Sequence, residues 1–419
     1  MIVVPQIFLY QEQVDKLWRE FMRCGMAQQR RALGMELDDG EVYHVYTTPP
    51  RAHFAGTPCL AVVDMRGMPP ENEAPPDLGP QDGARVVVLL SLADGRVRAR
   101  GFAYREEHWV EGSVKFVPMR AETYLRSAGL LETDVLEQKS VAVVGLGSGG
   151  SAIAVALAQA GVGRMTLVDR DRLEIGNVSR HACGVGDLGR RKTRALHDLV
   201  LGKNPAIDVA VHDLDVVEQP AALREALDGV DLLIGATDGD ASRFLVNQVA
   251  LELGVTTVFG RVLTRAAGGD VLRVRPHAGP CLACIYTEHF LAQRPREYSR
   301  LPEVREDTAS YVPETDLEAK IQVGLASDIA PVANLMTKIA LVELSRHSAG
   351  GLETVDADLR ADFYIWANRR EGVYASWSPM EFSYTQPSIL RWYGADVSHR
   401  PDCGACGIAV KPTSGFFGT

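Results

Sequence analysis

A glycine-rich turn, together with the acid that ends the next apolar run, is the part of the chain whose residue types could do chemistry. The apolar run 141–144 is followed at once by a Gly-x-Gly-x-x-Gly pattern, and Asp169 ends the apolar run 165–168. Glycines allow a tight strand-to-helix turn and close approach of the backbone to a phosphate, and an acid after the second strand can bind ribose hydroxyls. The pattern predicts a nucleotide site that contains Gly145, Gly147, Gly150 and Asp169.

Charged and amide side chains are dense in the residues that follow this acid. They include Asp171, Asn177, Arg180 and Lys192, whereas a dehydrogenase usually lacks such a polar cluster after its second strand. Repeated cations beside a phosphate site suit a triphosphate and a leaving pyrophosphate. Asp238 ends a further apolar run, where its carboxylate could hold a magnesium ion that bridges phosphates. The residues therefore favour ATP with Mg²⁺.

In order along the chain, these motifs resemble those of the ThiF/MoeB family, the adenylating domain shared with ubiquitin-activating enzymes. The resemblance covers roughly residues 120–350 and rests on G-L-G-S-G-G-S, A-G-V-G, D-R-D-R-L, G-N-V-S-R-H, the 189–192 segment, N-P, A-T-D and C-L-A-C. It implies adenylation of the C-terminal carboxylate of a small ubiquitin-like or sulfur-carrier protein. By motif position it also implies that Asp169 holds the ribose, that Asn177, Arg180 and Lys192 contact phosphates, and that Asp238 binds magnesium.

A basic residue ahead of the first strand is a further expectation from the resemblance. In the family such a residue reaches an ATP phosphate, often in the other subunit of a dimer. Arg120 and Arg126 both lie in the hinge 120–140, and their spacing does not choose between them. A solvated arginine on an amphipathic helix is the alternative for each.

Four of the seven cysteines form two Cys-x-x-Cys pairs, Cys281 with Cys284 and Cys403 with Cys406. Two short thiolate hooks can close a tetrahedral zinc site with no open coordination position. Such a site would be structural and would pin the C-terminal tail to the nucleotide domain. A redox pair is the alternative, but the context is not that of a thioredoxin.

Cys183 is the best candidate for a thioester nucleophile, although the family does not normally place its nucleophile there. It follows Arg180 closely, and a positive field near the phosphates would lower the pKa of a thiol. A small buried residue is the alternative. The span 285–324, where ubiquitin-activating enzymes carry their cysteine, has none and is predicted to be a long crossover loop.

The order of apolar runs predicts an α/β chain with a Rossmann-like, doubly wound, mostly parallel sheet. We expect three parts: an N-terminal α+β accessory or partner-binding domain at 1–118, the adenylation domain at 119–350, and a zinc-pinned tail at 351–419. In the first part the spacing predicts a helix over 14–26, strands at 42–46, 60–63, 86–92 and 97–104, and a proline-rich loop over 68–82. The aromatic-rich tail would cover a protein substrate or the edge of the sheet.

Composition sets the class of protein. The chain has 419 residues, 46% of them apolar, which allows several buried cores, and its net charge of −10 argues against nucleic acid as the main partner. The sequence shows no signal peptide and no apolar stretch long enough for a bilayer, so we expect a cytoplasmic protein that acts away from the membrane.

The function expected from these observations is ATP-dependent activation of a ubiquitin-like protein for transfer to a conjugating partner, by a chain that forms a homodimer as the family does. Adenylation of a sulfur carrier, a peptide or a tRNA base is the enzymatic alternative. A non-catalytic nucleotide-binding scaffold is the alternative from another class, but such a scaffold usually loses the cations and the magnesium acid that are present here.

Overall fold

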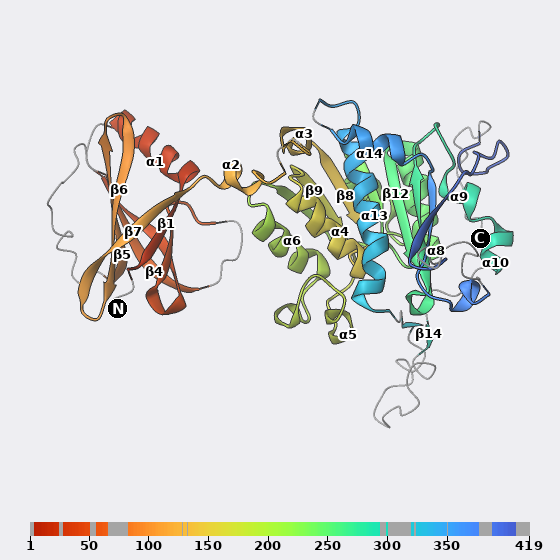
Figure 1. Cartoon of the computed structure of the whole chain (residues 1–419), viewed down its shortest axis with the longest axis horizontal. Coiled ribbons are helices and arrows are strands. Elements are labelled where there is room, and N and C mark those ends of the chain that lie inside the picture. The colour runs from red at the N-terminus through yellow and green to blue at the C-terminus, as the bar shows by residue number, and fades with distance from the viewer. Residues whose placement is uncertain are drawn as a thin grey trace, which may run out of the picture. The chain divides into compact units, whose positions relative to one another are not determined.

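The chain divides into two compact units, Met1–Arg126 and Ser127–Thr419. Figure 1 shows both units. The computed structural model describes residues 4–24, 28–50, 56–65, 83–127, 129–131, 133–293, 299–300, 320–321, 324–349, 351–376 and 388–407.

The first unit is a closed barrel of seven strands packed with helix α1 (Gln11–Cys24). Val14, Leu17 and Phe21 on one side of α1 share a core with the inward-facing side chains of the strands. A short helix α2 (Met119–Thr123) follows the barrel. Around the barrel the strands run in the order β1 (Gln6–Tyr10), β3 (Val42–Tyr46), β2 (Gln28–Leu37), β4 (Thr57–Met65), β5 (Ala84–Ala93), β6 (Arg96–Arg105) and β7 (His108–Val117).

The closure of this barrel is a feature that the sequence pattern did not predict. The four expected strands are present within β3, β4, β5 and β6, and the expected helix is α1. Strand β1 pairs in parallel with both β3 and β7, and this pairing closes the ring. Closure leaves no open strand edge, because every strand has two neighbours. The proline-rich segment 68–82 lies outside the described residues.

The second unit is built on an eight-stranded sheet. The first strand of this unit, β8 (Ser140–Val144), lies inside the sheet, third from one edge. The strands that follow it along the chain lie first on one side of it and then on the other. The order across the sheet is β10 (Asp208–His212), β9 (Arg164–Val168), β8, β11 (Leu232–Gly235), β12 (Thr256–Val262), β13 (Gly268–Val274), β16 (Phe363–Ala367) and β17 (Arg391–Ala395). The strand order therefore reverses at the boundary between β8 and β11, because β9 and β10 lie on one side of β8 and β11 lies on the other.

The expectation of a mostly parallel sheet is corrected by these pairings, because the sheet is mixed. The strands from β10 to β12 are parallel to their neighbours. From β12 onward the pairs with β13, β16 and β17 are antiparallel. Only the short segment 263–267 joins β12 to β13, and a parallel pairing would need a crossover of a dozen or more residues.

Helices cover both faces of the sheet, as expected for a doubly wound fold (Figure 1). Helix α4 (Ser148–Gln159) packs against α6 (Lys192–Lys203) and α13 (Ala326–Ser345). Helices α7 (Pro220–Ala226), α8 (Asp240–Leu253) and α9 (Leu282–Ile285) pack against the strands in one core cluster. In the residues that the structure describes, this cluster contains no residue of α4, α6 or α13. The shorter elements are α3 (Thr133–Glu137), α5 (Ile175–Val178), α10 (Glu288–Gln293), α14 (Glu353–Asp358), β14 (Ser299–Arg300) and β15 (Lys320–Ile321).

The segment after residue 350 contributes two strands to the same sheet. Strand β16 pairs with β13, and β17 pairs with β16. Most of the expected crossover loop at 285–324 lies outside the described residues. Within the described part of the chain, no helix combines the length and the apolar character needed to cross a bilayer.

Candidate functional site

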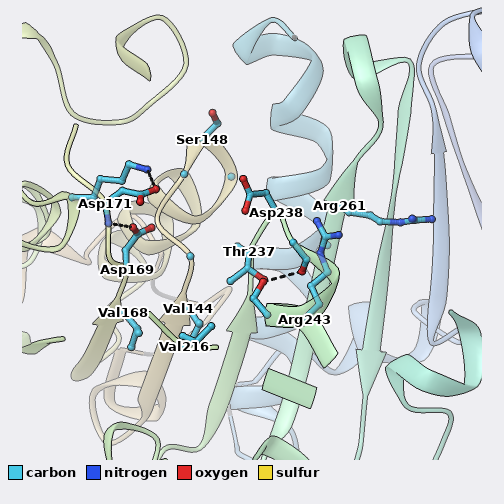
Figure 2. A pocket seen from close by; sticks show the side chains of 18 of the residues that line it. Val144, Ser148, Val168, Asp169, Asp171, Val216, Thr237, Asp238, Arg243 and Arg261 are labelled. Carbon is cyan, nitrogen blue, oxygen red and sulfur yellow. Dashed lines mark hydrogen bonds and ion pairs between the residues drawn. The ribbon is translucent and has the colours of Figure 1, made fainter. Parts of the chain in front are cut away.

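A cavity of about 490 Å³ opens at the carboxyl ends of β8 and β11, where the strand order reverses. Ligands of open α/β sheets bind at this point of the fold, because the loops after the two strands separate there. Figure 2 shows Asp169 and Asp171 on one side of the glycine turn, and Thr237, Asp238 and Arg243 on the other. Val144, Val168 and Val216 supply an apolar wall below them.

The glycine turn between β8 and α4 is closely packed against the neighbouring strand. Gly145 has φ +90°, and a Cβ there would meet the backbone of Ala236 at 2.7 Å. A Cβ on Gly150 would lie 1.9 Å from the carbonyl oxygen of Gly145. Gly147, by contrast, has open space around it and lines the cavity. Two of the three predicted glycines are thus needed for packing, and the third presents backbone to a ligand.

Asp169 lies at the end of β9 and lines the cavity as the sequence predicts. Its two carboxylate oxygens accept hydrogen bonds from the Leu146 amide at 2.6 Å and the Asp171 amide at 2.7 Å. Burial raises the pKa of this carboxyl above its usual range, while nearby Lys192 and the two amides act in the opposite direction. The carboxylate therefore orients the glycine turn and still has lone pairs that could accept ribose hydroxyls.

Two of the predicted phosphate-binding cations reach the same cavity. Lys192, at the start of α6, is almost fully buried, and its Nζ lies 2.9 Å from Oδ2 of Asp171. Arg180 is half-buried, and burial lowers the pKa of its guanidinium, which stays charged at neutral pH. Positive groups held in a partly desolvated cavity interact more strongly with a polyphosphate than the same groups would in water.

Asp238 is exposed and lines the cavity just after β11. An exposed carboxylate at the edge of a polyphosphate site is the donor type that magnesium prefers, since the ion usually takes one or two carboxylates, phosphate oxygens and water. The residues present therefore fit the ion that the sequence predicts.

Two buried arginines that line the cavity were not predicted to be nucleotide ligands from the sequence. Arg243 is 5% exposed, lies on α8 beyond Asp238, and pairs with Asp240 at 3.6 Å. Arg261 on β12 bonds Asp270 at 2.7 Å. The signal for Arg261 was a charged residue inside the apolar strand TTVFGRV, because a buried charge requires a partner.

Besides Gly150, which packs against the carbonyl of Gly145, three predicted site residues are not among the described residues that line the cavity. Asn177 completes a capping box, in which its Oδ1 accepts the Glu174 amide at 3.0 Å. Arg126 is exposed and belongs to the first unit as the contacts divide the chain. The side chain of Arg120, the alternative, lies outside the described residues. The third residue is Cys183.

The expected lowering of the Cys183 pKa is wrong. The thiol is 4% exposed, and burial, followed by the charge of Asp187, raises its pKa to about 12. Arg190 acts in the opposite direction but does not offset the loss of solvation. The thiolate needed for nucleophilic attack is therefore strongly disfavoured at neutral pH.

The four predicted zinc ligands come together at one place. The sulfur atoms of Cys281, Cys284, Cys403 and Cys406 all lie within 4.8 Å of one another. Their closest separations, 3.4, 3.7 and 3.9 Å, are near the roughly 3.8 Å expected when four sulfurs surround one zinc at about 2.3 Å. Asn247 of α8 accepts the Leu282 amide at 3.1 Å, so the first hook is also fastened to the helix that follows Asp238.

Taken together, the fold and the cavity are those of a nucleotide-binding type of α/β domain, with a cavity lined by cationic side chains and a separate cluster of four cysteines that could hold a metal ion. A model of the ThiF family matches residues 120–362, more than half of the chain, and the chain therefore belongs to the ThiF family. The resemblance noted from the sequence motifs is confirmed.

Known relatives of the chain include several proteins named as activating enzymes. It is 28% identical to ubiquitin-like modifier-activating enzyme 5 of Caenorhabditis elegans over 37% of this chain and 39% of that protein. It is 31% identical to the adenylyltransferase and sulfurtransferase UBA4 of Yarrowia lipolytica over 36% of this chain and 37% of that protein. An uncharacterized protein, y4oA of Sinorhizobium fredii, is 27% identical over 56% of this chain and 42% of its own length. The chain thus spans less than half the length of these curated relatives.

Among solved structures, E. coli MccB with ATP superposes with a TM-score of 0.45 and 16% identity, over 66% of this chain and 68% of that one.

His181 makes the stability of this domain depend on pH. Its ring is buried, and burial lowers the pKa below the usual value of 6.5. The hydrogen bond to Leu146 and the charge of Asp187 oppose this shift in pKa, and Lys192 acts in the same direction as burial. Below about pH 6.5 the unfolded chain binds a proton that the folded chain does not, so the free energy of unfolding should fall as the pH is lowered from there. Urea unfolding at pH 7.5 and 5.5 measures this loss. It should be smaller in His181→Gln, and an equal loss in both proteins would contradict the assignment.

Proposed function

We propose that this protein adenylates the C-terminal carboxylate of a small ubiquitin-like protein, with ATP and Mg²⁺ and release of pyrophosphate, for transfer to a conjugating partner. The observation that carries the proposal is the convergence of the glycine turn, Arg180, Lys192 and Asp238 on one cavity at the switch point of the sheet. The names of the relatives support it, since they include a ubiquitin-like modifier-activating enzyme and an adenylyltransferase.

The chemistry requires little proton transfer, because the nucleophile is already a carboxylate. Its oxygen attacks the α-phosphorus, the bond from that phosphorus to the bridging oxygen breaks, and pyrophosphate leaves. Arg180 and Lys192 line the cavity and would neutralise charge that builds up on the leaving group. Asp238 would hold the magnesium ion, which would supply further neutralisation of the phosphate oxygens. Most of the rate enhancement would then come from positioning and fixed charge.

The exchange of labelled pyrophosphate into ATP tests this proposal directly. We expect exchange that requires a ubiquitin-like protein with a free C-terminal glycine, and a loss of at least about a hundredfold in Asp238→Ala, as for removal of other transition-state charge stabilisers. Asp228→Ala is the matched control, because this exposed carboxylate lies at the other end of the sheet, ahead of β11. Tight ATP binding without exchange for any carrier would instead favour a scaffold, or a sulfur-carrier, peptide or tRNA-base substrate.

The proposal extends to the other parts of the chain. We assign residues 1–118 to partner binding, 119–350 to adenylation and 351–419 to closing the zinc site. A homodimer in which Arg120 or Arg126 reaches the ATP of the other subunit, and a cytoplasmic location, belong to the same proposal.

We place Cys183 as a buried structural residue and not as the acceptor of the activated acyl group, since its thiol is buried and has a raised pKa. A non-reducing gel after incubation with ATP and carrier should therefore show the same species for the wild type and for Cys183→Ala. A thioester band that disappears in the variant would reverse this assignment.

A further inference from the structure

The backbone of Leu146, in the middle of the glycine turn, makes two hydrogen bonds, one through its N–H and one through its carbonyl oxygen. Its N–H donates to Oδ2 of Asp169 at 2.6 Å, and its carbonyl oxygen accepts from Nε2 of His181 at 2.8 Å. Leu146 is fully buried and is not among the described residues that line the cavity. Gly145 and Gly147 on either side of it line the cavity.

The ring of His181 makes a second bond with its other nitrogen. The Cys183 amide lies 3.0 Å from Nδ1, and because an amide donates, Nδ1 must accept. Nε2 faces a carbonyl and must therefore carry the proton. The ring is thus neutral, with one donor directed at the glycine turn and one acceptor directed at its own segment. Burial of the ring, which lowers its pKa, favours the same state.

A second point of attachment lies one helical turn into α4. The Ala182 amide donates to Oγ of Ser151 at 3.2 Å, and that hydroxyl donates to the carbonyl of Ser148 at 3.3 Å. Ser151 is fully buried. The segment that follows Arg180 is therefore attached to the glycine turn through His181 and to the start of α4 through Ser151. We call these two residues, with the four hydrogen bonds that they make, the loop clasp.

We propose that the loop clasp positions the phosphate-binding backbone of residues 145–149 relative to Arg180, with His181 as the main positioning residue. Arg180 precedes His181 directly, so a ring anchored to Leu146 places the adjacent guanidinium at a set distance from the turn. The amides of the turn and the guanidinium can then bind the same polyphosphate without reordering the segment first. This inference rests on the proposed function for its substrate, ATP.

The two nitrogens of the ring can be removed separately by matched substitutions. In His181→Gln the side-chain amide nitrogen can occupy the place of Nε2 and still donate to Leu146, but nothing replaces Nδ1. In His181→Asn the side-chain oxygen can occupy the place of Nδ1 and accept the Cys183 amide, but the bond to Leu146 is lost. Both substitutions exchange an imidazole for a carboxamide, so they differ chiefly in which bond is kept.

The test measures the dissociation constant of ATP with Mg²⁺ by calorimetry on the full chain. His181→Asn should weaken binding about tenfold, the usual effect of one lost buried hydrogen bond, and His181→Gln should recover most of that loss. A merely structural role in holding the 177–183 segment would give the opposite order, since the asparagine keeps the bond within the segment. Equal affinities for the two variants would overturn the proposal.

Coupling to Arg180 gives an independent readout. In an Arg180→Met background the further loss from His181→Asn should shrink to about twofold or less, because the cation that the clasp positions is gone. Fully additive losses would contradict the coupling. If both His181 variants fail to fold, Ser151→Ala removes the second attachment point alone and should weaken ATP binding several-fold, with an unchanged affinity refuting the clasp.

The outcomes also separate this inference from the proposed function. Wild-type protein that binds ATP but exchanges no pyrophosphate would refute adenylation and leave the order of the His181 variants as the test of the clasp. Wild-type protein that exchanges pyrophosphate, with equal ATP affinity in the asparagine and glutamine variants, would refute the clasp alone. A wild type that does not bind ATP would refute both.

Discussion

Cys403→Ser is expected to abolish stoichiometric zinc binding and to destabilise the second unit by several kcal/mol. Cys403 is 4% exposed, and its sulfur lies 3.7 Å from that of Cys281, although the two residues are 122 positions apart in the sequence. A closed four-thiolate zinc site can supply on the order of 10 kcal/mol, as much as the whole stability of an ordinary domain. The same cysteines belong to the core cluster with α7 and α8, so loss of the metal also exposes apolar contacts.

Cys24→Ser is the matched control for this prediction. Cys24 is exposed at the end of α1 in the first unit, so it should change neither the metal content nor the unfolding of the second unit. Zinc content by elemental analysis and thermal unfolding with and without a chelator provide the measurements. One zinc per chain in the Cys403→Ser protein, with an unaltered unfolding temperature, would show that the four sulfurs do not form a structural metal site.

Arg273→Met is expected to lower the free energy of unfolding by about 3 to 5 kcal/mol, the usual cost of removing one partner from a buried ion pair. The Arg273 side chain is 2% exposed. Its Nε donates to Asp362 at 2.7 Å, and Nη1 donates to Glu343 at 3.2 Å. Nη2 donates to the carbonyls of Leu359 and Ala361 at 3.0 and 3.1 Å.

The large effect follows from what Arg273 connects. It lies on β13, Glu343 lies on α13, and the carbonyls belong to the segment that leads into β16. Methionine has a similar length and no charge, so the substitution leaves two acids and two carbonyls with fewer donors at little change in volume. Arg275 continues to pair with Glu343 at 2.6 Å, which limits the loss for that carboxylate.

Arg224→Met provides the comparison in the same unit. Arg224 pairs with Glu252 between α7 and α8, and both side chains are about half exposed, so removal of this pair should cost less than about 1 kcal/mol. Denaturant unfolding followed by circular dichroism measures both variants. Equal small losses for Arg224→Met and Arg273→Met would mean that the buried network contributes no more than a surface pair.

Several parts of the site could be predicted from the sequence because their signals are local. The turn after β8 requires glycine at Gly145 and Gly150, whatever the rest of the chain does, since a Cβ at either position would collide with backbone. Asp169 and Asp238 each end an apolar run, and the carboxyl ends of parallel strands meet at one edge of the sheet. The Cys-x-x-Cys spacing likewise identifies a metal hook without knowledge of its partner.

Other features depend on contacts between segments that are distant in sequence. The turn from β12 to β13, and the return of residues 363–367 to pair beside β13, made the sheet mixed, and no periodicity distinguishes the two edges of a strand. The parallel pairing of β1 with both β3 and β7 closed the barrel in the same way. Burial reversed the expected pKa direction of Cys183, because proximity to arginine in sequence says nothing about loss of solvent.

By itself, the sequence determined the glycine turn, the acids that flank it, the two Cys-x-x-Cys pairs and the family to which the chain belongs. Only the tertiary structure decided which neighbours those residues have. His181 donates to the Leu146 carbonyl, and Asn177 caps a helix. Arg243 lies buried beside the cavity. Each of these positions results from packing. The physical reason is that backbone conformation and ligand chemistry are encoded over a few residues, whereas solvation and hydrogen-bond partners are set by which distant segments come together.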